Sequence, residues 1–179
     1  MVRGEETKTA ALILVTLCLV IHGMAWLAGG IDLGRYSLVR GCSLMSRMSY
    51  HFLHTSMLHA VLNCWCLLSV VFVYRVPIYY LALAFVIATT IPSFLLSHCP
   101  TVGLSGVCFA LIGMIVFQTK RRWVFHLWVL LFVLLTSLMC SVMSAMGVGI
   151  VRANNVLHVY CYVVGLVISY LNSPAHGKE

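Results

Sequence analysis

The chain has 179 residues, of which 62% are hydrophobic and 8% are charged, and its mean hydropathy is +1.04. This composition excludes an ordinary soluble domain, because about a quarter of the residues in such a domain are charged. The net charge of +7 does not indicate nucleic-acid binding, since the basic residues lie between apolar runs and not on one soluble face. The apolar runs are continuous rather than alternating, which indicates an all-α membrane protein.

Six apolar segments follow one another, and each can cross all or most of a hydrocarbon core about 30 Å thick. We expect residues 1–179 to form a single domain, a polytopic bundle of six transmembrane helices. The first segment is too long for a signal-peptide core and has no clear cleavage site, so we expect it to be retained. The longest connection, 30–51, is mixed in character and is expected at the membrane interface. The segments cover residues of about 10–29, 52–73, 77–96, 104–119, 123–146 and 155–171.

The basic residues predict the orientation of the bundle. With the N-terminus in the cytoplasm, seven of the eleven lysines and arginines lie inside, including the "KRR" run at 120–122. The second, fourth and sixth segments then all run from the outer side to the inner side. We expect a multi-pass protein of a membrane, most simply the plasma membrane of a bacterium.

Polar side chains stand near the starts of those three segments. The second carries His54, His59 and Asn63, the fourth begins at Ser105, and the sixth carries His158. Polar groups inside spanning segments are costly and usually mark a functional site. The helix from Ser105 would be only about 22 Å long, so the serine is expected below the outer surface, after a loop that dips into the membrane.

Small residues on the fourth and sixth segments predict close packing of these two helices. Such stripes allow helix backbones to approach one another in lipid. Ser105 and His158 stand at the outer ends of the two stripes. The stripe residues are Gly106, Ala110 and Gly113 on the fourth segment, and Cys161, Gly165 and Ser169 on the sixth.

A serine beside a histidine is suited to nucleophilic catalysis, because the imidazole can take the hydroxyl proton and later pass it to a leaving amine. The only acid expected on the outer side is Asp32, in a distant loop, so a dyad is favoured over a triad. Gly103 permits backbone angles closed to other residues, and the free N–H groups at a helix start can bind an oxyanion. His59 and Asn63 share a helix face and can donate to the same oxyanion.

The three motifs resemble those of the rhomboid family of intramembrane serine proteases. "HTSMLHAVLN" fits H-x4-H-x3-N, "GLSG" fits G-x-S-G, and "HVYCYVVG" fits H-x2-G-x3-G with Cys161 in place of a glycine. The resemblance covers roughly residues 10–171. It implies that Ser105 is the nucleophile and His158 the general base.

The resemblance also implies supporting roles. Asn63, His59 and the Ser105 backbone would form the oxyanion hole, His54 would order the first loop, and Phe109 would pack on the catalytic histidine ring. Single-pass transmembrane proteins would be the substrates, and no cofactor or metal would be needed. In the first loop, Ser46 and Arg47 stand where the family usually has a Trp-Arg pair.

Two other interpretations remain. The first is a catalytically inactive relative that binds transmembrane clients, although such relatives typically lose the serine or the histidine, and this chain has both. The second is a metal or haem protein that uses His54, His59 and His158. His54 and His59 are five residues apart, about 140° around a helix, and so would not face one ligand together.

Overall fold

The structure is a computed structural model that describes residues 4–30, 32–145 and 154–172. Within these residues all regular elements are helical, and Leu38 and Thr101 form one isolated antiparallel bridge. The elements are α1 (Glu5–Leu27), α2 (Leu33–Tyr36), α3 (Leu44–Ser49), η1 (Tyr50–Phe52), α4 (Met57–Val73), α5 (Ile78–Thr89), η2 (Ser93–Leu95), α6 (Ser105–Ile115), η3 (Val116–Gln118), α7 (Arg122–Ala145) and α8 (Asn155–Leu171).

Two helices are shorter than the apolar segments that predict them. The second segment was expected from residue 52, but α4 begins at Met57, where the Ser56 hydroxyl caps the helix by accepting a hydrogen bond from the His59 N–H. The third was expected to reach residue 96, but α5 ends at Thr89, ahead of Pro92. A proline cannot donate the backbone hydrogen bond that a continuing helix needs, which accounts for the early end.

Only α1 is long and apolar enough by itself to count as a clear membrane span among the described residues. The stretch Leu44–Phe52 joined to α4 would make a second, bent by 88° at the break. The helices α5, α6 with η3, and α8 are apolar but shorter, and so is the stretch Arg122–Leu135 of α7. The expectation of six crossings therefore stays a prediction.

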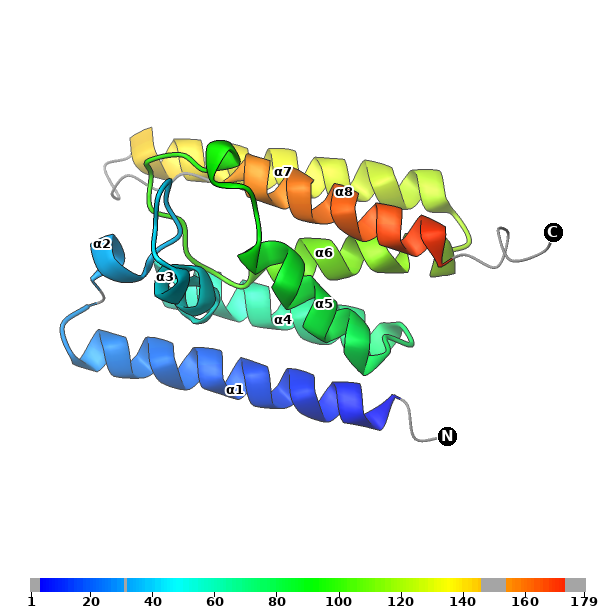
Figure 1. The fold of residues 1–179 in the computed structure, drawn as a ribbon, viewed down its shortest axis with the longest axis horizontal. Coiled ribbons are helices and arrows are strands. Elements are labelled where there is room, and N and C mark those ends of the chain that lie inside the picture. Colours follow the sequence, from blue (N-terminus) through cyan, green and yellow to red (C-terminus); the bar gives the residue numbers. More distant parts are fainter. Residues whose placement is uncertain (1–3, 31, 146–153, 173–179) are drawn as a thin grey trace.

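The helices α4, α6 and α8 all start toward the end of the bundle that carries α2 and α3, and run away from it (Figure 1). This is the common direction that the sequence predicts for the second, fourth and sixth segments. The polar residues near the three helix starts are therefore brought to one end of the molecule.

The central helix of the bundle is α6, because nine of its eleven residues are buried. Its closest partner is α8. A Cβ atom added to Gly113 would lie 2.3 Å from the Tyr162 carbonyl oxygen, and one added to Gly165 would lie 2.2 Å from the Ala110 carbonyl oxygen. Any side chain at either glycine would therefore push the helices apart, and the predicted small-residue packing is present.

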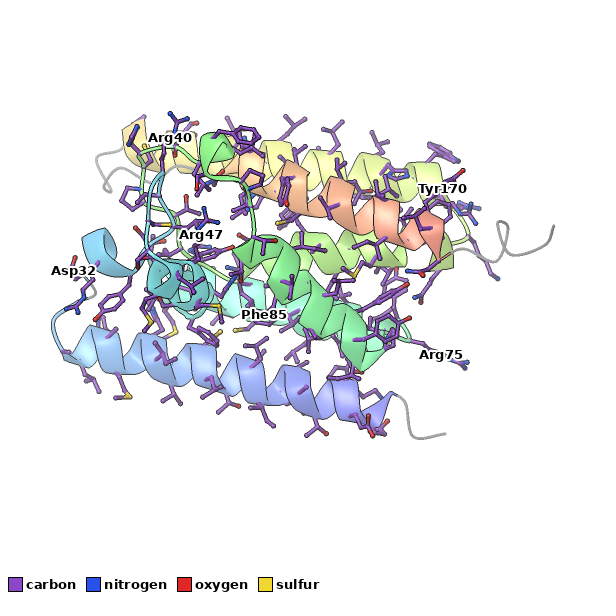
Figure 2. The ribbon with its side chains drawn as sticks, viewed as in Figure 1. Asp32, Arg40, Arg47, Arg75, Phe85 and Tyr170 are labelled. Carbon is purple, nitrogen blue, oxygen red and sulfur yellow. The ribbon has the colours of Figure 1, made fainter. Side chains whose placement is uncertain are left out.

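The first loop is fastened to the bundle by Arg47 of α3, whose side chain reaches the end of α5 (Figure 2). Its guanidinium donates to the carbonyl oxygens of Thr89 at 2.9 Å and Ile91 at 2.7 Å, and to Ser93 Oγ at 2.7 Å. The Ser46 hydroxyl donates to the Arg35 carbonyl oxygen at 2.8 Å. The loop is thus anchored without the tryptophan that the family usually has.

Candidate active site

Ser105 and His158 meet at the contact between α6 and α8. Ser105 is the first residue of α6, and His158 lies in the first turn of α8. The Ser105 Oγ and His158 Nε2 atoms are 2.9 Å apart, which is hydrogen-bond distance. The glycine packing of α6 on α8 sets this distance, because it fixes how closely the two helix starts approach.

No carboxylate assists the histidine within the described part of the chain. The other ring nitrogen of His158, Nδ1, is buried and has no hydrogen-bond partner there. Asp32 instead accepts a hydrogen bond from the Arg35 backbone N–H, in the loop after α1. Within these residues, Ser105 and His158 form a hydrogen-bonded pair without a third, acidic member.

The ring of Phe109, one turn after Ser105 on α6, lies against the ring of His158. The two ring centroids are 4.4 Å apart and the ring planes are inclined by only 20°. A stacked aromatic neighbour restricts rotation of the imidazole, so Phe109 helps to keep Nε2 directed at Ser105. The family resemblance predicts an aromatic residue in this place.

Gly103 is the point on which His59 and Asn63 converge. Its φ of +120° is a backbone conformation that residues with a side chain rarely adopt. A Cβ atom there would lie 3.0 Å from both Asn63 Nδ2 and His59 Nε2. The glycine thus permits a strained turn and also leaves space for two side chains from α4.

These two side chains present hydrogen-bond donors near Ser105. Asn63 Nδ2 is buried and lacks a partner among the described residues. His59 Nδ1 is 3.1 Å from the Thr55 hydroxyl, and a proton donated by Thr55 would leave the histidine proton on Nε2, the ring nitrogen that faces Gly103. No side chain caps α6, so the first N–H groups of this helix also remain available.

His54 acts on the loop before Ser105. Its Nε2 accepts a hydrogen bond from the Leu104 N–H at 3.5 Å, and its ring packs edge-on against His59 with centroids 5.1 Å apart. The other side of His54 faces His22 of α1, with centroids 6.2 Å apart. His22 is buried, and no motif in the sequence indicates this contact.

Asn154 is another residue of the site that the motifs do not reveal. Its Oδ1 accepts from the Leu157 N–H at 3.0 Å and so caps α8, while its Nδ2 donates to Thr101 Oγ1 at 2.8 Å. The pair "NN" ahead of an apolar run is a helix-start signal that predicts the cap. The bond to Thr101 depends on the tertiary fold.

A cleft of about 210 Å³ lies between α4, α6 and α7 and reaches Phe109. Its lining is almost entirely apolar, with Val70 from α4, Ile112 from α6 and Phe132 from α7 among the wall residues. The cleft therefore suits an apolar segment better than a soluble peptide. Among the described residues, no group of three His, Cys, Asp or Glu side chains is placed to hold a metal ion.

Comparison with known families gives a match to the Rhomboid domain over residues 41–175, which is more than half of the chain. Comparison with curated proteins found no match. The chain belongs to the rhomboid family. Membership of this family makes it a membrane protein, in agreement with its composition and its apolar helices.

Proposed function

We propose that this protein is an intramembrane serine endopeptidase that cleaves transmembrane segments of single-pass membrane proteins with a Ser105–His158 dyad. The observation that carries the proposal is the 2.9 Å contact between Ser105 Oγ and His158 Nε2 at the end of two tightly packed helices. The apolar cleft that reaches Phe109 supports the substrate class. In this proposal, residues 1–179 form one domain that crosses the membrane six times. The "KRR" loop then lies on the cytoplasmic side of a bacterial plasma membrane.

In the acylation step, Ser105 Oγ attacks the scissile carbonyl carbon while His158 Nε2 takes the hydroxyl proton. The carbonyl oxygen becomes an oxyanion, which accepts hydrogen bonds from the Ser105 N–H and the side chains of Asn63 and His59. The tetrahedral intermediate then collapses, and His158 gives its proton to the departing amine nitrogen. An ester on Ser105 remains.

In the deacylation step, water attacks the ester carbonyl and gives a proton to His158 Nε2. The second intermediate collapses, the Ser105 oxygen recovers the proton, and the product carboxylic acid leaves. Because no carboxylate orients the imidazole within the described residues, the stacked ring of Phe109 carries more of that task than in a triad enzyme.

The proposal is tested with purified protein reconstituted in liposomes with a model single-pass protein that carries small residues in its spanning segment. We expect cleavage inside or near the outer end of that segment. Ser105→Ala and His158→Ala should abolish it, whereas Ser141→Ala and His98→Ala, on exposed positions, should not. Equal cleavage by Ser105→Ala would contradict the proposal.

An inactive relative that binds transmembrane clients would use the same cleft and would bind the model protein without cutting it. The intact hydrogen bond of the dyad favours the protease over this alternative. The liposome experiment separates them, because binding without cleavage would support the inactive relative.

A further inference from the structure

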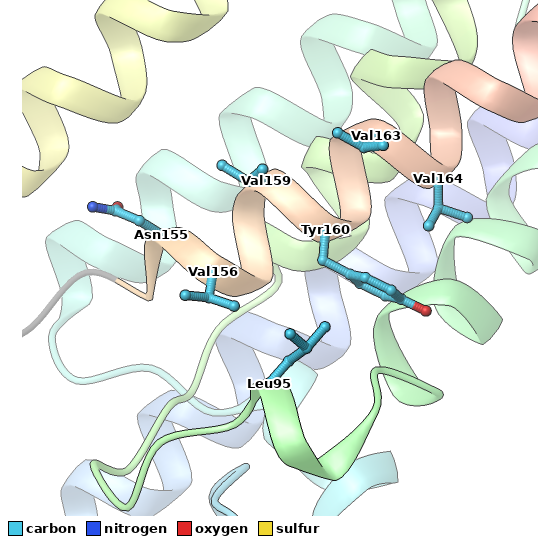
Figure 3. A pocket seen from close by; sticks show the side chains of 7 residues that line it. All are labelled: Leu95, Asn155, Val156, Val159, Tyr160, Val163 and Val164. Atoms are coloured by element: carbon cyan, nitrogen blue, oxygen red, sulfur yellow. The ribbon is translucent and has the colours of Figure 1, made fainter.

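A groove of about 470 Å³ lies along α8 (Figure 3), and neither Ser105 nor His158 lines it. One side is formed by Leu95 of η2, which projects toward α8 between Val156 and Tyr160. The rest follows α8 as far as Val164. The catalytic steps proposed above use none of these residues.

The length of the groove matches that of a lipid acyl chain in one leaflet. From Val156 to Val164 the helix rises about 12 Å, which is close to the thickness of one leaflet of a hydrocarbon core about 30 Å thick. An extended acyl chain that lies along α8 would therefore cover the groove within one leaflet.

The groove offers an apolar surface to the lipid. Val156, Val159 and Val163 are each about half exposed, at 49%, 53% and 47%. In a membrane protein, a hydrocarbon chain covers such a surface better than water or a polar segment does.

A basic group contacts the backbone on either side of Leu95, a lining residue of the groove. The Arg40 guanidinium donates to the carbonyl oxygens of Leu96 at 3.1 Å and Phe94 at 3.1 Å, the two neighbours of Leu95. The side chain is exposed, and Figure 2 places it at the end of the bundle where α8 begins. The two carbonyl oxygens accept hydrogen bonds from Arg40, but they carry no net charge and so do not neutralise the guanidinium.

The charge of Arg40 is not balanced by an acid within the described residues, where the one ion pair joins Lys8 to Glu5. The chain holds four acidic residues against eleven basic ones, so carboxylates are scarce throughout. An anion supplied from outside the protein would complement the guanidinium, and a phosphate is a group that arginine can bind in a bidentate manner.

We propose that this groove and Arg40 form a binding site for an anionic phospholipid, with an acyl chain along Val156–Val164 and the phosphate on the Arg40 guanidinium. The site goes beyond the proposed protease activity and does not depend on it. A neutral phospholipid would fit the groove but would lack a net charge to pair with Arg40.

Native mass spectrometry of the full-length protein tests this site, with palmitoyl-oleoyl phosphatidylglycerol compared against palmitoyl-oleoyl phosphatidylcholine. We expect the protein to retain the anionic lipid with about fivefold higher affinity, the factor that corresponds to one basic residue near an anionic surface. Arg40→Gln should remove the preference, and Arg40→Lys should keep most of it. Arg35→Gln changes an exposed arginine of α2 and should leave the preference for the anionic lipid unchanged.

A second variant tests the groove itself. Val159→Trp places an indole ring in the groove and should lower retention of both lipids. An unchanged melting temperature of this variant would show that it is folded. Equal retention of the two lipids by the wild-type protein would overturn the proposal, and so would a preference that survives Arg40→Gln. A lipid-free wild-type dimer that Val159→Trp dissociates would assign the groove to a second copy and overturn it as well.

Discussion

The side chain of Asn154 joins the start of α8 to the loop in front of Ser105, because it caps the helix and also donates to Thr101 Oγ1 at 2.8 Å. Thr101 in turn pairs through its backbone with Leu38 of the first loop, with N···O distances of 2.9 and 3.2 Å. Asn154 is four residues before His158, and Thr101 is four residues before Ser105. The two halves of the dyad are thus connected by a hydrogen bond outside the helices.

Loss of this connection should slow catalysis without unfolding the protein. Thr101→Val removes the hydroxyl and keeps the shape, and we expect a loss of about 1 kcal/mol of interaction and a severalfold slower reaction of Ser105. Thr101→Ser, which restores the hydroxyl, should react at close to the normal rate. Reaction rates and melting temperatures of both variants provide the measurement, and equal rates for the two would argue against the connection.

Asn63 is expected to act in the transition state. Loss of one donor from an oxyanion hole typically slows a reaction by about 10²–10³. We expect the turnover of Asn63→Ala to fall by this factor, while a serine-directed probe still labels Ser105 in the variant. If Asn63 is only a packing residue, the variant will melt earlier but the folded fraction will turn over normally, so turnover and melting should be measured together.

The contact between α6 and α8 should tolerate no added side chain. A Cβ at Gly165 would meet the Ala110 carbonyl oxygen at 2.2 Å, and this backbone group cannot rotate away. We expect Gly165→Ala to destabilise the protein by about 1–3 kcal/mol, as overpacking generally does. Gly23→Ala is the matched control, because no atom lies within 4 Å of a Cβ there. A melting curve for Gly165→Ala that equals the control would contradict the packing.

Arg47 is expected to hold the first loop against the bundle. Hydrogen bonds from a charged donor contribute about 1.5–3 kcal/mol, and Arg47 makes two to carbonyl groups and one to a hydroxyl. Arg47→Ala should therefore lower the melting temperature and expose the loop to limited proteolysis. Arg75→Ala changes an exposed arginine and should alter stability by no more than about 0.5 kcal/mol.

Much of the fold follows from local signals in the sequence. The apolar runs predict the long helices, and the small-residue stripes predict the approach of α6 to α8. The helix ends depend on single residues inside the apolar runs. A hydropathy profile does not predict these helix ends, because Ser56, which caps α4, and Pro92, which follows α5, both lie within the apolar runs.

Some residues of the candidate site can likewise be predicted from the sequence, and others cannot. Ser105, His158, Asn63 and His59 stand in motifs with a recognisable spacing, so they can be predicted from the sequence. The contacts of His22 with His54 and of Asn154 with Thr101 join residues 32 or more positions apart and fit no repeating pattern. Such contacts exist only once the chain has folded, and a single sequence does not indicate them.

The nucleophilic character of Ser105 is tested most directly with a fluorophosphonate probe on the purified, folded protein, followed by mapping of the labelled residue. We predict a single covalent adduct on Ser105, with labelling much slowed in His158→Ala, because the imidazole that takes the hydroxyl proton is missing. A folded wild-type protein that is not labelled, or that is labelled on another residue while Ser105→Ala reacts equally, would contradict the dyad.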